Sequence, residues 1–209
     1  MFARLEVVTP PTGEPVELDL VRKHCRIDHD YDDGLLKLYL SAARQLAESY
    51  LNRALCPTSF RYTITNSPPP TASPLVPQSL IVFPLNWPPL IRKPIELPRA
   101  PLQKVTEVAW GPVDELKVAD EELYTVNSGV EPGQVMIQPS LVPMMPAMSV
   151  RFEYEAGYET PEQIPDPVRA GILILTAHLY EQRGDVEAAL PEAAYNVMGA
   201  HRLWSFGAP

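Results

Sequence analysis

The sequence predicts an α+β protein in which helices from both ends of the chain form a helical bundle and an antiparallel β domain is inserted between them. Three observations lead to this prediction. The first two are helical periodicity at both ends of the chain and short alternating segments in its middle. The third is the content of 25 prolines among 209 residues, which excludes a uniform helical bundle because proline disrupts helix interiors. We expect an N-terminal helical part at residues 1–56, a proline-rich β insert at 57–160, and C-terminal helices at 161–209 that complete the helical domain.

The N-terminal block is predicted to form two helices, near residues 17–26 and 31–52. Apolar residues of the first repeat at helical spacing, and those of the second form two neighbouring stripes beside a narrow polar face. A helix with so narrow a polar face must be covered on more than one side. The linker Asp28–Asp33 offers several N-cap candidates and places negative charge at the positive end of the second helix.

The middle block loses helical periodicity, and prolines separate its short apolar runs. The clearest run is Ser149–Glu155, in which Val150, Phe152 and Tyr154 alternate with polar residues, as in a strand with one buried face. Further runs also have strand character: 59–65, 80–83, 90–97, 104–110, 123–126 and 134–138. These short strands with turn signals between them predict an antiparallel β domain.

The C-terminal block is predicted to contain a helix near residues 166–183, with Asp166 as its N-cap and Pro167 as its first helical residue. This helix is apolar almost all round, with four aliphatic residues in succession from Ile172 to Leu175. We therefore expect it to be buried against its own fold and against a neighbouring subunit.

The end of the chain carries aromatic residues where a terminus is normally frayed and polar. Trp204 and Phe206 lie beyond the last strong helical segment, and aromatic anchors of this kind are typical of docking hot spots. Together with the apolar helix they define a predicted interface: Ile172, Leu175, Leu190, Arg202, Leu203, Trp204 and Phe206. The alternative is that Trp204 folds back onto the helices of its own chain.

Composition and charge exclude several classes of function. The formal net charge is -9 and no segment forms a basic patch, so tight nucleic-acid binding is not expected. The N-terminal residues lack the apolar core of a signal peptide, and no run approaches the ~18 to 20 apolar residues of a membrane span. We expect a soluble protein made in the cytoplasm, with no membrane partner.

No motif points to catalysis or to a cofactor. Neither a P-loop nor a dinucleotide-binding glycine pattern is present in the sequence. The carboxylates of Asp28, Asp30 and Asp32 have the spacing of a calcium loop, but Asp33 occupies its glycine position and Tyr39 its final glutamate position. We therefore predict no catalytic, cofactor-binding or metal-ligating residues, and no enzyme.

Several segments, in order along nearly the whole chain, resemble the head-tail connector (adaptor) proteins of tailed phages, the HK97 gp6-like family, in its longer form with a β-rich insert. The resemblance depends on the combination of these segments: Val16–Asp33, Ala42-Ala43-Arg44, Asn52–Leu55, Pro101–Val108, Tyr124–Val126, Glu131–Gly133, Tyr154–Tyr158, Ile164–Val168, His178–Glu181, and Leu190 with Pro191 through Arg202–Trp204. The proline-rich stretch 68–89 departs from the usual pattern of the family.

The resemblance implies a structural role in the neck of a virion. Subunits of this family form a ring, usually of twelve, beneath the portal, and DNA passes through its channel. The implied partners are the chain itself, the portal protein, and a tail or stopper protein, in a phage, a prophage particle or a gene-transfer agent. Two alternatives remain: another neck component, such as a stopper or tail-completion protein, and a small-molecule enzyme whose site has no recognisable motif.

Overall fold

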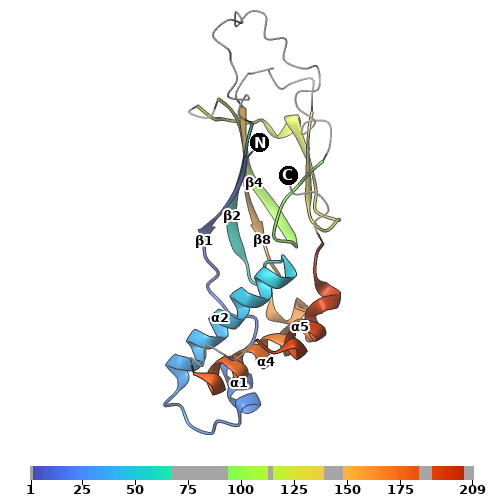
Figure 1. Cartoon of the computed structure of the whole chain (residues 1–209). Coiled ribbons are helices and arrows are strands. Elements are labelled where there is room, and N and C mark those ends of the chain that lie inside the picture. Colours follow the sequence, from blue (N-terminus) through green and yellow to red (C-terminus); the bar gives the residue numbers. More distant parts are fainter. Residues whose placement is uncertain (1, 67–93, 113–114, 139–147, 184–189, 205–209) are drawn as a thin grey trace, which may run out of the picture.

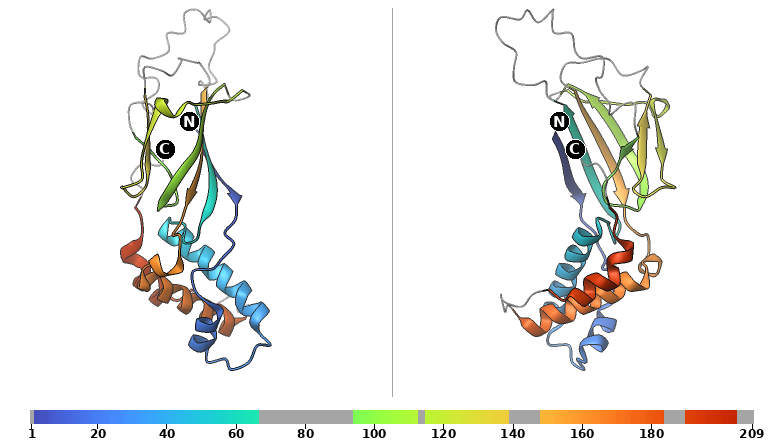
Figure 2. Two further views of the ribbon diagram at one scale, coloured as in Figure 1. Left: turned by 180° about the vertical axis from the view of Figure 1, so that it is seen from behind. Right: turned by 45° about the vertical axis from the view of Figure 1, so that its right-hand side comes forward.

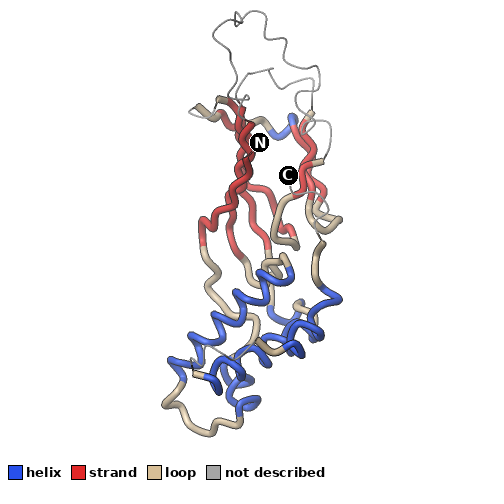
Figure 3. The backbone as a smooth tube through the Cα atoms, viewed as in Figure 1, coloured by secondary structure: helices blue, strands red, loops and turns tan. Residues whose placement is uncertain are grey.

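A computed structural model describes residues 2–66, 94–112, 115–138, 148–183 and 190–204. The subunit is elongated, with its helices gathered at one end and its strands at the other (Figures 1 and 3). Helices from both ends of the chain lie side by side in two views (Figure 2). The strands between residues 58 and 156 lie between the two groups of helices in the sequence, whereas one strand, at residues 2–9, precedes all the helices.

The helical unit contains α1 (Leu18–Cys25), α2 (Asp33–Leu51), α4 (Asp166–Gln182) and α5 (Glu192–Met198). Helix α2 packs against α4, and α4 packs against α5. Their shared core is apolar and contains Val21, Leu36, Leu40, Ala43, Ala47, Leu51, Leu55, Val168, Ile172, Leu175, Ala194 and Met198. The predicted helices therefore form, and helices from both ends of the chain pack together.

The acidic side chains at the helix starts act differently from the prediction. Pro165 is the N-cap of α4 and Asp166 is its first helical residue, because Pro165 has the extended backbone that precedes a helix; Asp166 pairs with Arg169 instead. Asp32 is the N-cap of α2, but its carboxylate accepts a hydrogen bond from the Tyr180 hydroxyl of α4 rather than from its own helix. Asp32 therefore connects α2 to α4, whereas Asp166 forms an ion pair within its own helix.

In the part of the chain that the structure describes, eight strands form two antiparallel sheets. The larger sheet has the order β1 (Phe2–Thr9), β2 (Thr58–Asn66), β8 (Met148–Ala156), β4 (Leu102–Gly111) and β5 (Lys117–Val118). The smaller sheet has the order β3 (Ile95–Glu96), β7 (Gln134–Ile137) and β6 (Tyr124–Asn127). Short 3-10 turns, η2 (Glu121–Leu123), η4 (Pro161–Gln163) and η5 (Gly199–His201), complete the described elements.

The two sheets share one hydrophobic core and so form a sandwich. Phe152 and Tyr154 of β8 are almost completely buried, while Arg151 and Glu153 point to the opposite face of the sheet and form ion pairs there. The alternation predicted for Ser149–Glu155 is therefore confirmed.

Some strands differ from the prediction. β1 pairs with β2 along nearly its whole length, although no strand is predicted before residue 59. It is an edge strand, and six of its eight residues are exposed, which weakens the alternation that marks a strand. The predicted strand 80–83 and residues 90–93 of the predicted strand 90–97 lie outside the described residues, and within 94–97 the strand is Ile95–Glu96.

Candidate interaction surfaces

Helix α5 holds the C-terminal part of the chain against the helical unit. The Tyr50 ring of α2 meets the Tyr195 ring edge-on, with centroids 4.7 Å apart, and the Tyr50 hydroxyl donates to the Tyr195 carbonyl at 3.3 Å. On the other side, a Cβ atom at Gly171 would overlap the Met198 side chain, so the glycine permits the close approach of α4 and α5. The position of α5 is thus fixed by side chains from both α2 and α4.

Beyond α5, one side-chain and one backbone hydrogen bond anchor the chain to the C-terminal end of α2 and the residues that follow it. The Arg53 Nε atom donates to the His201 carbonyl at 2.7 Å, and the Leu203 amide donates to the Leu51 carbonyl at 3.0 Å. From there the chain rises from the helical unit toward the sandwich (Figure 1). The segment is therefore held by its own subunit as far as Leu203.

Tyr50, Arg202 and Trp204 form what we call the C-terminal stack. The Arg202 guanidinium lies 4.9 Å from the Tyr50 ring centroid and 4.4 Å from that of Trp204, distances typical of cation–π contacts. Trp204 is nevertheless 64% exposed, because Arg202 covers only part of its indole. An indole held in place yet exposed is a suitable anchor for a partner.

The remaining residues of the predicted interface lie in different environments. Ile172 and Leu175 are fully buried in the core of their own subunit, so the prediction that they form an interface is wrong. The physical reason is that α1, α2 and α5 together cover the faces of α4 that the sequence leaves apolar. Leu190 is half-buried against the same core, and Phe206 lies outside the described residues.

The junction of helices and sandwich contains buried charged groups that the sequence analysis does not identify. The side chain of Arg53, only 9% exposed, places its Nη2 atom 2.6 Å from Glu131 Oε2, in the loop before β7. Arg99 donates from Nη1 to the Glu48 carbonyl of α2 at 2.7 Å. No spacing in the sequence relates these residues, since each pair joins segments far apart along the chain.

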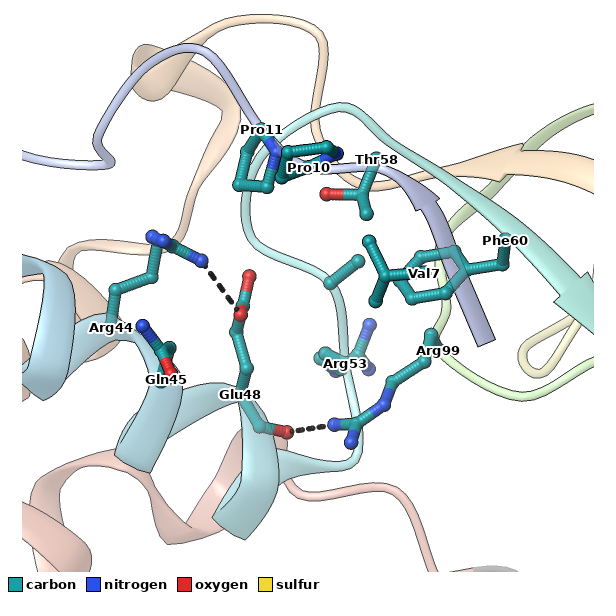
Figure 4. Close-up of a pocket in the computed structure, with 11 residues that line it drawn as sticks. Val7, Pro10, Pro11, Arg44, Gln45, Glu48, Arg53, Thr58, Phe60 and Arg99 are labelled. Atoms are coloured by element: carbon teal, nitrogen blue, oxygen red, sulfur yellow. Dashed lines mark hydrogen bonds and ion pairs between the residues drawn. The ribbon is translucent and has the colours of Figure 1, made fainter. Parts of the chain in front are cut away.

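A cavity of about 370 Å³ lies in this junction, between α2 and the end of β1 (Figure 4). Its charges are largely paired: the Arg44 Nε atom is 2.9 Å from Glu14, and Arg44 Nη1 is 3.0 Å from Glu48. Its apolar lining comes from Val7, Pro10, Pro11, Ala54 and Phe60. Paired charges and apolar walls fit a seam between two structural units better than a reaction site.

The groups near this seam also lack the properties of a nucleophile. Burial raises the pKa of the Cys56 thiol to about 12, so the thiol stays protonated near neutral pH. Among the described residues, no three His, Cys, Asp or Glu side chains gather closely enough to hold a metal ion. Within the same ranges, no helix is both long and apolar enough to cross a membrane.

Comparison with known proteins gives the chain a family context. Residues 15–110, from the start of α1 to β4, match the family model of the phage gp6-like head-tail connector proteins. The predicted family resemblance is confirmed over this range. No curated protein matches the sequence.

Solved structures share the fold of this chain over nearly its whole length. A chain of the virion of a native gene transfer agent particle is 20% identical, with a TM-score of 0.69 and coverage of 98% of both chains. A chain in the neck of an empty gene transfer agent particle, computed with C6 symmetry, is 21% identical, with a TM-score of 0.70 and coverage of 99% of this chain and 100% of that one. A third, from the neck of the native particle computed with C12 symmetry, is 20% identical, with a TM-score of 0.64 and the same coverage. At these identities the likeness shows a common fold, and that fold includes both the sandwich and the closing helices.

Proposed function

We propose that this chain is a head-tail adaptor, a structural protein whose copies form a ring between the portal and the tail at the neck of a virion. The observation that carries the proposal is the agreement of two comparisons. The connector family model covers α1 to β4, and the full length of the chain shares its fold with chains from particle necks.

A ring of twelve copies with a channel for DNA is the form of this adaptor that we infer. Its support is the C12 symmetry with which one neck structure was computed, together with the C6 symmetry of another, since twelve is a multiple of six. The net charge of -9 suits a channel through which DNA must pass without being retained, because like charges repel.

We further infer that the C-terminal stack docks on the portal protein, and that Leu190, Leu203 and Phe206 contribute to the same interface. Tryptophan and arginine are the residues most enriched where interfaces lose most affinity on truncation. The chain presents both, Trp204 exposed and Arg202 held against its ring. The partner face is expected to be apolar, with an acceptor for the Arg202 guanidinium.

Alanine substitution separates this docking role from a purely structural one. Trp204→Ala should reduce binding to the purified cognate portal at least tenfold while leaving the thermal unfolding midpoint nearly unchanged. Val197→Ala is the matched control, because Val197 is 40% exposed on the adjacent α5 and has no place in the stack. Unchanged portal binding by the Trp204 variant would contradict the docking role.

Deletion of the gene from its source tests the adaptor role as a whole. Without an adaptor, DNA-filled heads should accumulate with portals exposed and no tails attached, and expression of the intact chain should restore joined particles. If the chain were instead a stopper or tail-completion protein, a different protein would still be bound to the portal in the deletion strain. Normal tailed particles in the deletion strain would overturn the proposal.

A further inference from the structure

Strand β1 is an open edge of the larger sheet. It pairs with β2 on one side only, and no other strand of the described residues lies beside it. Phe2, Val7 and Val8 on this strand are 72%, 57% and 46% exposed. Exposed apolar edge strands are templates for pairing with another chain, and proteins normally cover or charge them. The strand is therefore a candidate for pairing between subunits.

The opposite side of the same sheet is only partly closed. β5 pairs with Ala109 and Trp110 of β4, and the last backbone bond on this side runs from the Ala119 amide to the Val108 carbonyl at 2.8 Å. Within the described residues, no strand pairs with 102–107 on the side of β4 that faces away from β8. The sheet thus has open backbone at both sides.

The direction and register of the two edges are compatible. Along the order β1-β2-β8-β4 every neighbour is antiparallel, so β4 is antiparallel to β1 and to β8. Glu107, Val105 and Lys104 of β4 lie opposite Glu153, Tyr154 and Glu155 of β8, across a bulge. A copy of β1 that follows the same register on the free side brings Arg4 to Glu107, Leu5 to Val105, and Glu6 to Lys104.

This register also keeps each face of the sheet consistent. Leu5 lies opposite Tyr62 and packs on the sandwich core, as the inner side chains do. Arg4 and Glu6 lie opposite Thr63 and Arg61, whose side chains share the outer face with Glu153. Pairing would therefore place apolar beside apolar and charge beside opposite charge.

Charge complementarity is strongest at Glu107. Glu107 lies directly opposite Glu153, and like charges in that position are unfavourable. Arg151 contacts both, at 2.7 Å from Glu107 and 3.7 Å from Glu153. Glu153 has a second cation in Arg61 at 2.8 Å, whereas Arg151 is the one ion-pair partner of Glu107 within the described residues. A second cation on the free side of Glu107 would complete the pairing.

Arg4 is suited to supply that cation. Its side chain is 76% exposed, and its carboxylate partner at 2.8 Å is Glu6, two residues along the same strand. Lys104, which would meet Glu6, is 61% exposed and pairs with Glu155 at 3.1 Å. Exposed ion pairs contribute little stability, so exchanging partners between subunits costs little.

We propose that β1 of one subunit adds to the open edge of β4 in the next copy of this chain, with Arg4 opposite Glu107. The contact is head-to-tail, because the two edges differ, and head-to-tail contacts form a ring when the rotation between successive copies closes. This inference rests on the proposed function, since the ring provides the neighbouring copy. The backbone bonds supply affinity, and the charge pairs fix the register.

Disulfide formation in assembled particles tests the contact. In one subunit, Arg4 and Glu107 lie three strand spacings apart, about 14 Å, which a disulfide cannot span. Particles that carry Arg4→Cys with Glu107→Cys should therefore give a ladder of cross-linked multimers on mild oxidation. Arg4→Cys with Glu121→Cys is the matched control, because Glu121 is exposed in η2 and lies off β4. The unsubstituted chain controls for Cys25 and Cys56.

The outcomes separate this inference from the proposed function. A ladder of multimers from the Arg4→Cys, Glu107→Cys variant, with none from the Glu121→Cys control, supports the strand contact. Particles that contain the chain in their necks but give no ladder overturn the contact and leave the adaptor role standing. Necks of particles with the unsubstituted chain that lack this chain overturn both. In addition, Arg4→Glu should reduce incorporation of the chain into particles, and Arg4→Glu with Glu107→Arg should restore it; failure of the double variant to restore incorporation counts against the register.

Discussion

Arg53 joins the helical unit to the sandwich through an ion pair with Glu131, in which Arg53 Nη2 and Glu131 Oε2 are 2.6 Å apart. The same guanidinium donates from Nε to the His201 carbonyl at 2.7 Å. One side chain thus connects the end of α2, the loop before β7 and the segment that leads to Trp204. The path of residues 201–204 away from α5 therefore depends on this side chain.

Glu131→Gln is expected to lower the free energy of unfolding by about 1–2 kcal/mol, because it leaves a nearly buried guanidinium without its counter-charge. Chemical denaturation followed by circular dichroism provides the measurement. Glu159→Gln is the control, since Glu159 is exposed and forms no ion pair within the described residues, and its effect should stay within about 0.5 kcal/mol. Equal losses in the two variants would mean that the pair contributes nothing to the junction.

Gly157→Ala should be strongly destabilising. Gly157 has a φ of 117°, and a Cβ atom there would overlap the Cys56 carbonyl. We expect a loss of more than about 2 kcal/mol in unfolding free energy. Gly34→Ala, in the first turn of α2 where nothing lies near the added atom, should leave stability unchanged or raise it by up to about 1 kcal/mol. A tolerated Gly157 variant would be incompatible with the described turn after β8.

Leu175→Ala tests whether this residue belongs to the core or to an interface. Because Leu175 is fully buried, truncation should cost about 2–5 kcal/mol of stability in the isolated subunit. Leu38→Ala removes a leucine that is 63% exposed on α2 and should change stability by less than about 0.5 kcal/mol. A Leu175→Ala variant that keeps its stability and fails only in assembly would instead support the prediction that Leu175 lies in an interface between subunits.

Much of this fold is predictable because it depends on local periodicity. The apolar stripes of α2 and α4 and the alternation of β8 are visible within single segments. β1 is not predictable in this way, since an edge strand with both faces partly exposed has no clear pattern, and its pairing with β2 spans more than fifty residues. The apolar residues on nearly all faces of α4 did not show what covers the helix. Burial within the same chain and burial by a neighbouring subunit require the same residue types.

The candidate site was only partly predictable. Trp204 was identifiable as an aromatic residue near the end of the given sequence, and it is 64% exposed, while its docking role stays a prediction. The support for it was not, because Tyr50 and Arg53 lie about 150 residues away and come into contact with Arg202 and His201 only through α5 packing. The ion pairs at the junction likewise join segments that are far apart along the chain, so no residue spacing in the sequence predicts them.

The two cysteines should differ in reactivity. The thiolate is the reactive form, and a pKa of about 12 leaves about one Cys56 thiol in ten thousand ionised at pH 8. Burial raises the pKa of Cys25 as well, but this residue is only half-buried. Iodoacetamide at pH 8, followed by peptide mass spectrometry, should modify Cys25 first and Cys56 only after unfolding. Equal rates in the native protein would contradict the burial of Cys56.

Imaging the neck of the cognate particle by cryo-electron microscopy, without imposed symmetry, tests the central claim most directly. The account predicts a ring of twelve copies of this chain in contact with the portal, with the elongated subunit fitting the density as a helical unit and a sandwich. A neck in which this chain is absent, or in which it lies away from the portal, would contradict the adaptor role.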